Sequence, residues 1–191
     1  FDAVADQTVS VDTTDDDAAG FTIEETDGST EVDESGTTDT FTVVLDAQPI
    51  SDVVLTITSD DTGEATVNGP LTFTPANWDT PQTVTVTGAD DSIIDGTVTS
   101  SVTVAVDDAN SDNDFDAVAD QTVSVDTTDD DVAGFTIVEL DGSTEVDESG
   151  TTDTFTVVLD AQPTSDVVLT ITSDDTGEAT VNSPLTFTPA N

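Results

Sequence analysis

Apolar and polar residues alternate in short runs along the chain. Thr40–Asp46 has the sequence TFTVVLD, and Thr83–Thr87 has the sequence TVTVT. Alternation with a period of two is typical of a strand with one buried face, and the abundant Thr and Val are β-branched residues that favour extended backbone. Because no run shows a helical period, the sequence predicts an all-β protein.

The sequence repeats itself with an offset of 114 residues. Residues 1–77 align with residues 115–191, and 72 of the 77 positions are identical. The differing pairs are Ala18/Val132, Glu24/Val138, Thr26/Leu140, Ile50/Thr164 and Gly69/Ser183. A unit of this size is large enough to form its own core, so the repeat predicts tandem domains rather than the turns of a solenoid.

An acidic motif followed by an apolar strand start indicates where each repeat begins. The motif TTDDD ends at Asp17 and again at Asp131, and both times a GFTI strand start follows within three residues. This frame predicts one complete repeat over 18–131. Residues 1–17 are then the C-terminal strand of a preceding repeat, and 132–191 the N-terminal part of the following one. We therefore expect the sequence to be a window on a longer protein.

Seven short strands separated by turn residues are predicted within the complete repeat. They are Gly20–Val32 with a break at Asp27–Ser29, Thr40–Asp46, Val53–Thr58, Ala65–Thr74, Thr83–Thr87, Val98–Val106 and Thr122–Asp126. The predicted inward side chains are Phe41, Val43, Leu45, Leu55, Ile57, Leu71, Phe73, Val84, Val86, Val102, Val104, Val106, Val123 and Val125. This pattern predicts an antiparallel seven-stranded immunoglobulin-like β-sandwich, repeated in tandem.

Strand direction assigns the acidic loops to the two ends of the sandwich. Sequential strands mostly alternate in direction, so every second connection lies at the same end. One end receives Glu34, Asp60, Asp61, Asp90, Asp91, Asp95, Asp129, Asp130 and Asp131. The counterparts of these residues in the flanking copies are Asp15, Asp16, Asp17 and Glu148. The other end receives Asp46, Asp52, Asp79 and the loop Asp107–Asp116.

The absence of basic residues means that no side chain of the chain can neutralise these acidic clusters. The chain has 43 acidic residues and no Lys, Arg or His, so its formal net charge is −43 and no salt bridge between side chains can form. Such a surface repels nucleic acid and other polyanions. Clustered carboxylates then require protonation or a cation, and oxygen ligands without His or Cys favour calcium. The alternative is a solvated acidic surface adapted to high salt.

A second candidate calcium loop lies in Asp107–Asp116. There Asp108, Asn110 and Asp112 follow the D-x-N-x-D spacing that opens a calcium loop, with Asp114 two residues further on. Asn113 stands where glycine is usual and Ala119 where a bidentate Glu would be expected. The alternative is an Asp/Asn-rich turn without an ion.

Motifs across the whole repeat resemble the Calx-β domain, known from sodium–calcium exchangers and from tandem copies in large bacterial surface proteins. The motifs are AGFTIEETDGSTEVDESG, PLTF, VTVTGADDSIIDGT and VSVDTTDDD. The resemblance implies an immunoglobulin-like sandwich that binds calcium where the last strand ends. The implied ligands are Glu34, Asp90, Asp91, Asp95, Asp129, Asp130 and Asp131, with Asp60 or Asp61 for the carboxylate between the third and fourth strands. Asp95 stands where the family has a longer Glu.

The sequence favours a structural role outside the cell. Near-identical copies suit an extender that holds another region of a long surface protein away from the cell. The alternatives are a subunit of an extracellular filament or sheath, with lateral copies as partners, and an adhesion module that binds a glycan or a protein. His, Cys, Lys and Tyr are absent, so we expect no enzymatic activity, and without an 18-residue apolar run we expect no membrane insertion.

Overall fold

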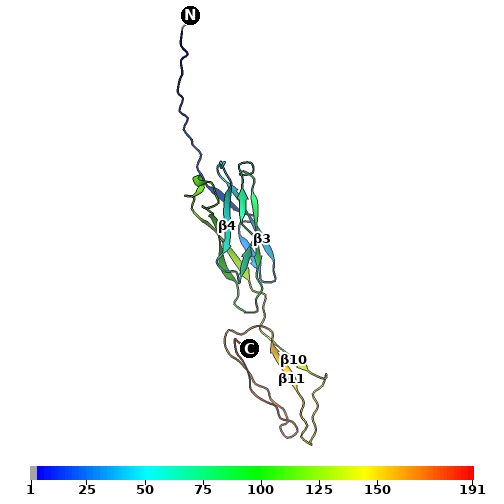
Figure 1. Ribbon diagram of the computed structural model, residues 1–191. Coiled ribbons are helices and arrows are strands. Elements are labelled where there is room, and N and C mark those ends of the chain that lie inside the picture. Colours follow the sequence, from blue (N-terminus) through cyan, green and yellow to red (C-terminus); the bar gives the residue numbers. More distant parts are fainter. Residues whose placement is uncertain (1–3) are drawn as a thin grey trace.

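The computed structural model describes residues 4–191 and confirms an all-β protein (Figure 1). One sheet contains four antiparallel strands in the order β1-β3-β7-β5. Its strands are β1 (Phe21–Glu25), β3 (Thr38–Leu45), β7 (Gln82–Gly88) and β5 (Ala65–Val67). None of the described residues forms a helix that is long and apolar enough to cross a membrane.

The other sheet contains five strands in the order β2-β9-β8-β4-β6. Its strands are β2 (Thr30–Asp33), β9 (Gln121–Thr128), β8 (Val98–Val106), β4 (Val53–Ser59) and β6 (Leu71–Phe73). β2 pairs with β9 in parallel, whereas all other neighbours in this sheet are antiparallel. The two sheets together form the sandwich in the middle of Figure 1.

Two of the seven predicted strands change sheets, so the sandwich has nine strands. The predicted strand Gly20–Val32 is β1 and β2, separated by a turn in which Gly28 has a φ of 87°. The predicted strand Ala65–Thr74 is β5 and β6, separated near Pro70, which has no N–H for a strand ladder. The prediction of antiparallel pairing is wrong for β2. The chain crosses to the other sheet without reversing direction, so β2 lies parallel to β9.

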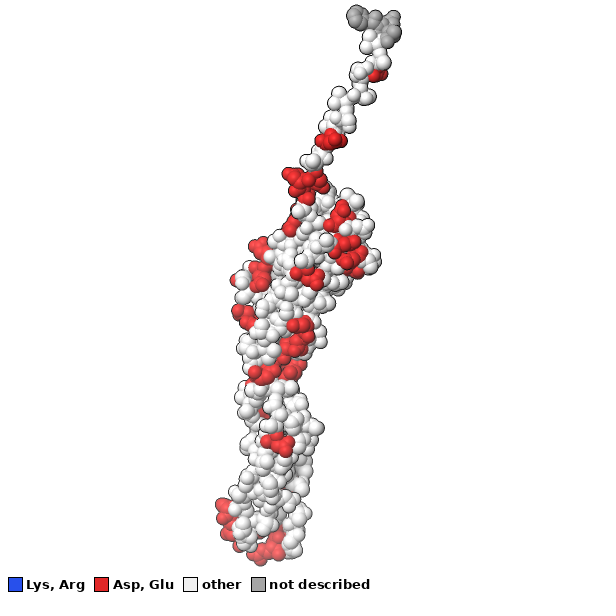
Figure 2. Space-filling model, turned by 90° about the vertical axis from the view of Figure 1, so that its left-hand side faces the viewer, with Lys and Arg blue, Asp and Glu red and all other residues white. Residues whose placement is uncertain are grey.

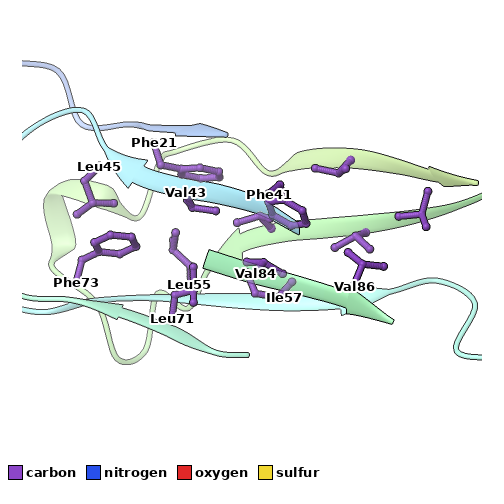
Figure 3. Packing of buried hydrophobic residues seen from close by; sticks show 14 of the residues in the cluster. Phe21, Phe41, Val43, Leu45, Leu55, Ile57, Leu71, Phe73, Val84 and Val86 are labelled. Atoms are coloured by element: carbon purple, nitrogen blue, oxygen red, sulfur yellow. The ribbon is translucent and has the colours of Figure 1, made fainter. Parts of the chain in front are cut away.

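The core lies between the two sheets and follows the predicted alternation. Phe41, Val43, Val84 and Val86 from one sheet are fully buried, as is Leu55 from the other. Figure 3 shows their side chains pointing toward one another between the ribbons. Val106 is the one predicted inward residue that is only half-buried.

A short 3₁₀ helix closes one end of the core. It spans η1 (Asn113–Phe115), and Phe115 is buried in the same cluster as the strand residues. The predicted open loop between the last two strands is therefore partly a structural element that adds an aromatic side chain to the core.

The described residues before and after the sandwich, 4–17 and 132–191, do not form a closed sandwich of their own. Residues 4–17 form no strand, and Val9 and Val11 are exposed, so the strand predicted within 1–17 is absent from the described part of that segment. Residues 1–3 lie outside the described residues. The segment 132–191 contains the pairs β10 (Phe135–Glu139) with β11 (Phe155–Leu159) and β12 (Val167–Leu169) with β13 (Leu185–Phe187). Their registers repeat those of β1–β3 and β4–β6.

Candidate metal centre

Four acidic side chains converge at the end of the sandwich that faces the following repeat. Glu34 directly follows β2, and Glu64 directly precedes β5. Asp91 and Asp95 lie in the loop between β7 and β8. One carboxylate oxygen from each residue lies within 4.8 Å of the others, so these side chains form a four-carboxylate cluster.

A second group shares one member with the first. Glu34, Asp129 and Asp131 also bring one carboxylate oxygen each within 4.8 Å of one another, and we call them the three-carboxylate cluster. Asp129 is the first residue after β9. Glu34 thus belongs to both groups, and the two clusters together contain six different residues.

Backbone hydrogen bonds fix the segments that carry these side chains. The Glu34 N–H donates to the carbonyl of Thr128 at 3.1 Å, and the Ala89 N–H donates to the carbonyl of Glu64 at 2.8 Å. The Gly96 N–H donates to Oδ2 of Asp129 at 2.9 Å, which ties the β7–β8 loop to the end of β9. The geometry of the clusters is therefore built into the strand ends.

Close packing of two strands also depends on a glycine at this end. Gly88 ends β7, and a Cβ added there would overlap the backbone carbonyl of Asp33. Because glycine has no Cβ, β7 can approach β2 closely. This approach sets the start of the β7–β8 loop beside Glu34.

The two glutamates are buried with oxygens that lack partners. Glu34 is 1% exposed and Glu64 is 7% exposed, and Oε2 of each has no hydrogen-bond partner among the described residues. The Oδ2 atom of Asp131 is also buried and has no hydrogen-bond partner among the described residues. Burying an unpaired carboxylate is costly unless the group is neutralised or paired. The arrangement therefore calls for a proton or a cation.

Burial and the close approach of these carboxylates raise the pKa values of the two buried glutamates. Burial, together with the charges of Asp91 and Asp129, raises the pKa of Glu34 to about 7. Burial and the charge of Asp95 also raise the pKa of Glu64. In contrast, the hydrogen bond from Gly96 lowers the pKa of Asp129. The raised pKa values mean that the ionised forms of Glu34 and Glu64 are destabilised in the folded protein, because no cationic side chain offsets their charge.

The ligand chemistry of the clusters suits a hard divalent cation. All six side chains offer oxygen, and calcium accepts six to eight oxygen ligands in flexible geometry. The chain has no His or Cys, the usual ligands of zinc and copper. The buried oxygens of Glu34, Glu64 and Asp131, which have no hydrogen-bond partner among the described residues, could act as ligands of such an ion.

Of the nine acidic residues that the sequence assigned to this end of the sandwich, five lie in the clusters and four do not. Those that meet are Glu34, Asp91, Asp95, Asp129 and Asp131. Asp60 accepts a hydrogen bond from the Ser101 N–H at 2.7 Å, and Asp61 accepts one from the Gly63 N–H at 3.0 Å. Asp90 and Asp130 are exposed and belong to neither cluster.

Sequence reasoning missed Glu64. For a carboxylate between the third and fourth strands it considered only Asp60 and Asp61, because they form an obvious acidic pair. Glu64 comes three residues later, directly before buried Ala65. A glutamate next to an apolar strand start, in a chain where glutamate is rare, was the available signal.

The candidate loop at the other end has a structural explanation. Asp112 is 3% exposed, and its Oδ2 accepts hydrogen bonds from the N–H groups of Ile50 at 2.7 Å and Ser51 at 2.9 Å. Its Oδ1 accepts from the Asp114 N–H at 3.2 Å. These bonds lower the pKa of Asp112. Asp108 and Asp114 are exposed, so the geometry matches the alternative of an Asp/Asn-rich turn.

The predicted ligands in the flanking copies stay apart. Asp15, Asp16 and Asp17 lie in the extended exposed segment, where the Asp17 N–H donates to Asp15. Glu148 is the counterpart of Glu34 and is exposed. Neither group belongs to a cluster among the described residues.

Acidic side chains are unevenly spread over the surface. On the face drawn in Figure 2 they lie at both ends of the sandwich and at the far tip of the C-terminal strand pairs, and the middle of those pairs carries few. One of these acidic regions is the end of the sandwich that holds the clusters.

Comparison with known proteins gives distant structural neighbours. No family model matches the chain, and no curated protein matches it. The CBD1 domain of Calx in its apo form is 16% identical, with a TM-score of 0.41 over 58% of this chain and 98% of that one. CBD12 from CALX1.2 is 18% identical, with a TM-score of 0.42 over 66% and 51%. The E. coli chaperone DraB is 6% identical, with a TM-score of 0.41 over 61% and 59%.

Proposed function

We propose that the repeat is a calcium-stabilised spacer domain of a long extracellular surface protein. One observation carries the calcium part of the proposal. Glu34 and Glu64 are buried, each with an oxygen that has no partner among the described residues, beside further carboxylates in a chain without a cationic side chain. A bound calcium ion would supply the missing partner.

The position of the clusters supports a role in stiffening the chain. Asp129 and Asp131 belong to the three-carboxylate cluster and also begin the short connection between β9 and β10. An ion held there would fix the first residues of the connection to the sandwich. A connection this short is not a flexible tether, so successive repeats would form a rod when the ion is bound.

The sheet edges favour a single rod over a laterally packed filament. The edge strands β1, β2, β5 and β6 have only five, four, three and three residues. Short edge strands offer few free backbone groups to another chain. A calcium sensor would be a different class of function. It needs a second module that responds differently, and near-identical repeats provide no such difference.

Two measurements on the 191-residue chain test this function. Calorimetric titration with calcium is expected to show binding, and thermal unfolding is expected to occur at a higher temperature with calcium than with chelator. Magnesium should bind more weakly because it demands near-ideal octahedral geometry. Small-angle scattering should show a longer and stiffer particle with calcium. If calcium changes neither the melting temperature nor the maximum dimension, the acidic surface is a salt adaptation and the proposal is wrong.

A further inference from the structure

The β7–β8 loop makes a direct contact with the following repeat. The Gln162 N–H donates to the carbonyl of Ser92 at 2.6 Å. Ile93 pairs with Gln162 in a parallel bridge, as one residue of an added strand would. Ile94 lines a hollow together with Ala133 and Thr164 of the next copy. The tip of the loop therefore rests on the segment that follows β11.

The same receiving segment occurs in the complete repeat. Gln162 is the counterpart of Gln48, and the surrounding sequence DAQP is identical in both copies. Each glutamine side chain donates to the carbonyl of a proline, Gln48 to Pro75 at 2.8 Å and Gln162 to Pro189 at 3.0 Å. The two segments thus share one local conformation.

In the complete repeat part of this segment is exposed. Ala47 and Pro49 are buried, but Gln48 is exposed, and its N–H has no hydrogen-bond partner among the described residues. Ile50, the counterpart of Thr164, is 84% exposed although it is a large apolar residue. A free donor beside an exposed apolar side chain is what the contact at Gln162 would cover.

We propose that the segment Ala47–Ser51 is the docking surface for the β7–β8 loop of a preceding copy of this repeat. The partner is thus another copy of the same domain, joined head to tail. Docking adds the backbone of the Ser92–Ile94 equivalent as a short parallel strand and covers Ile50 with an apolar side chain. The inference rests on the proposed spacer function and gives it a specific joint.

The docking loop is tied to the clusters at both ends. The Ile93 N–H donates to Oδ1 of Asp91 at 2.6 Å, and the Gly96 N–H donates to Asp129. Asp91 and Asp95 bracket the docking residues and belong to the four-carboxylate cluster. An ion in the cluster would therefore hold the loop in its docking conformation. By linkage, docking must raise the affinity for the ion by the same factor.

Disulfide trapping in the whole chain tests the contact, because the chain has no cysteine of its own. The first variant carries Ile93→Cys with Gln162→Cys, a pair whose strands lie about 4.8 Å apart in a parallel pairing, within the reach of a disulfide. The matched control carries Ile93→Cys with Gln48→Cys. Position 48 is nearer to position 93 along the chain, so random closure favours the control. Intramolecular bridging is followed by mass spectrometry under mild oxidation.

The proposal expects the first pair to bridge within one molecule several-fold faster than the control, with the preference reversed in urea. It also expects chelator to slow the first pair. The control variant should form cross-links between chains only slowly, because each loop is already held by the Gln162 segment of its own chain. Equal rates for the two pairs in native buffer would overturn the docking surface even if calcium binds. If the first pair bridges faster than the control and chelator does not slow it, the docking surface is supported but its coupling to the ion is wrong.

Discussion

Glu34 and Glu64 reach the same point from opposite sheets of the sandwich. Glu34 follows β2 of the five-stranded sheet, and Glu64 precedes β5 of the four-stranded sheet. Each is buried with one oxygen that has no partner among the described residues. A cation between them would join the two sheets, so metal binding and stability of the sandwich should be coupled.

Replacing one carboxylate of this pair should remove much of the stabilisation by calcium. Glu34→Gln keeps the shape of the side chain and removes a charge shared by both clusters. We expect the calcium-dependent rise in melting temperature to shrink strongly, because a neutral amide is a weaker calcium ligand. Thermal unfolding with calcium and with chelator measures the effect.

Glu148→Gln is the matched control for that substitution. Glu148 lies in an identical sequence context but is exposed and belongs to no cluster among the described residues. Its replacement should leave the calcium effect unchanged. If both variants respond like the unmodified chain, Glu34 does not hold the ion.

The stability of the metal-free protein should depend on pH. Burial and neighbouring charges raise the pKa of Glu34 from 4.5 to about 7 in the folded state. Between these values the folded state binds more protons than the unfolded state, so stability falls as the pH rises through the window. Denaturation at pH 5 and pH 7.5 in chelator should show the difference, and Glu34→Gln should reduce it. With calcium the stabilisation should instead grow toward pH 7.5, since the ion competes with the proton.

Asp112 should matter for folding and not for metal binding. Asp112→Ala leaves the N–H groups of Ile50, Ser51 and Asp114 without their acceptor, and an unsatisfied buried group costs about 1–3 kcal/mol. Chemical denaturation should show this loss of unfolding free energy, with an unchanged calcium titration. Asp108→Ala, at an exposed position, is the control. A loss of calcium binding in Asp112→Ala without a loss of stability would restore the calcium-loop hypothesis for this end.

The repeat also allows one core position to be tested twice. Phe41 is fully buried, and its counterpart Phe155 is only half-buried on the open pair β10–β11. Phe41→Ala should lower the unfolding free energy of the sandwich by about 3–5 kcal/mol, the usual cost for a buried aromatic side chain. Phe155→Ala should leave that transition nearly unchanged. Denaturant unfolding in calcium compares the two, and equal losses would mean that both copies contribute to one core.

Local sequence determined much of this protein. Alternation identified the strands and most of their buried side chains, because an inward position must be apolar wherever one face of a strand is covered. It did not name Phe21, Val32, Val53 or Ala65, which are also buried. Strand direction alone brought Glu34, Asp91 and Asp129 to one end, since it depends only on counting reversals. The crossing of two strands between sheets escaped this counting, because a bend within an alternating run leaves the pattern intact. Glu64 was missed for a different reason, because the acidic pair Asp60 and Asp61 lies in the same loop and the charge pattern alone does not show that only Glu64 is buried.

Only tertiary structure decided whether a given segment became a strand. The sequence QTVSVD occurs at residues 7–12 and at residues 121–126. The second copy lies within β9, between β2 and β8, whereas the first forms no strand and exposes its valines. A strand satisfies its backbone N–H and C=O groups through its neighbours, so identical residues differ in structure when the neighbours differ. The alternating sequence allows residues 121–126 to form a strand, and they do so because β2 and β8 lie on either side to pair with them.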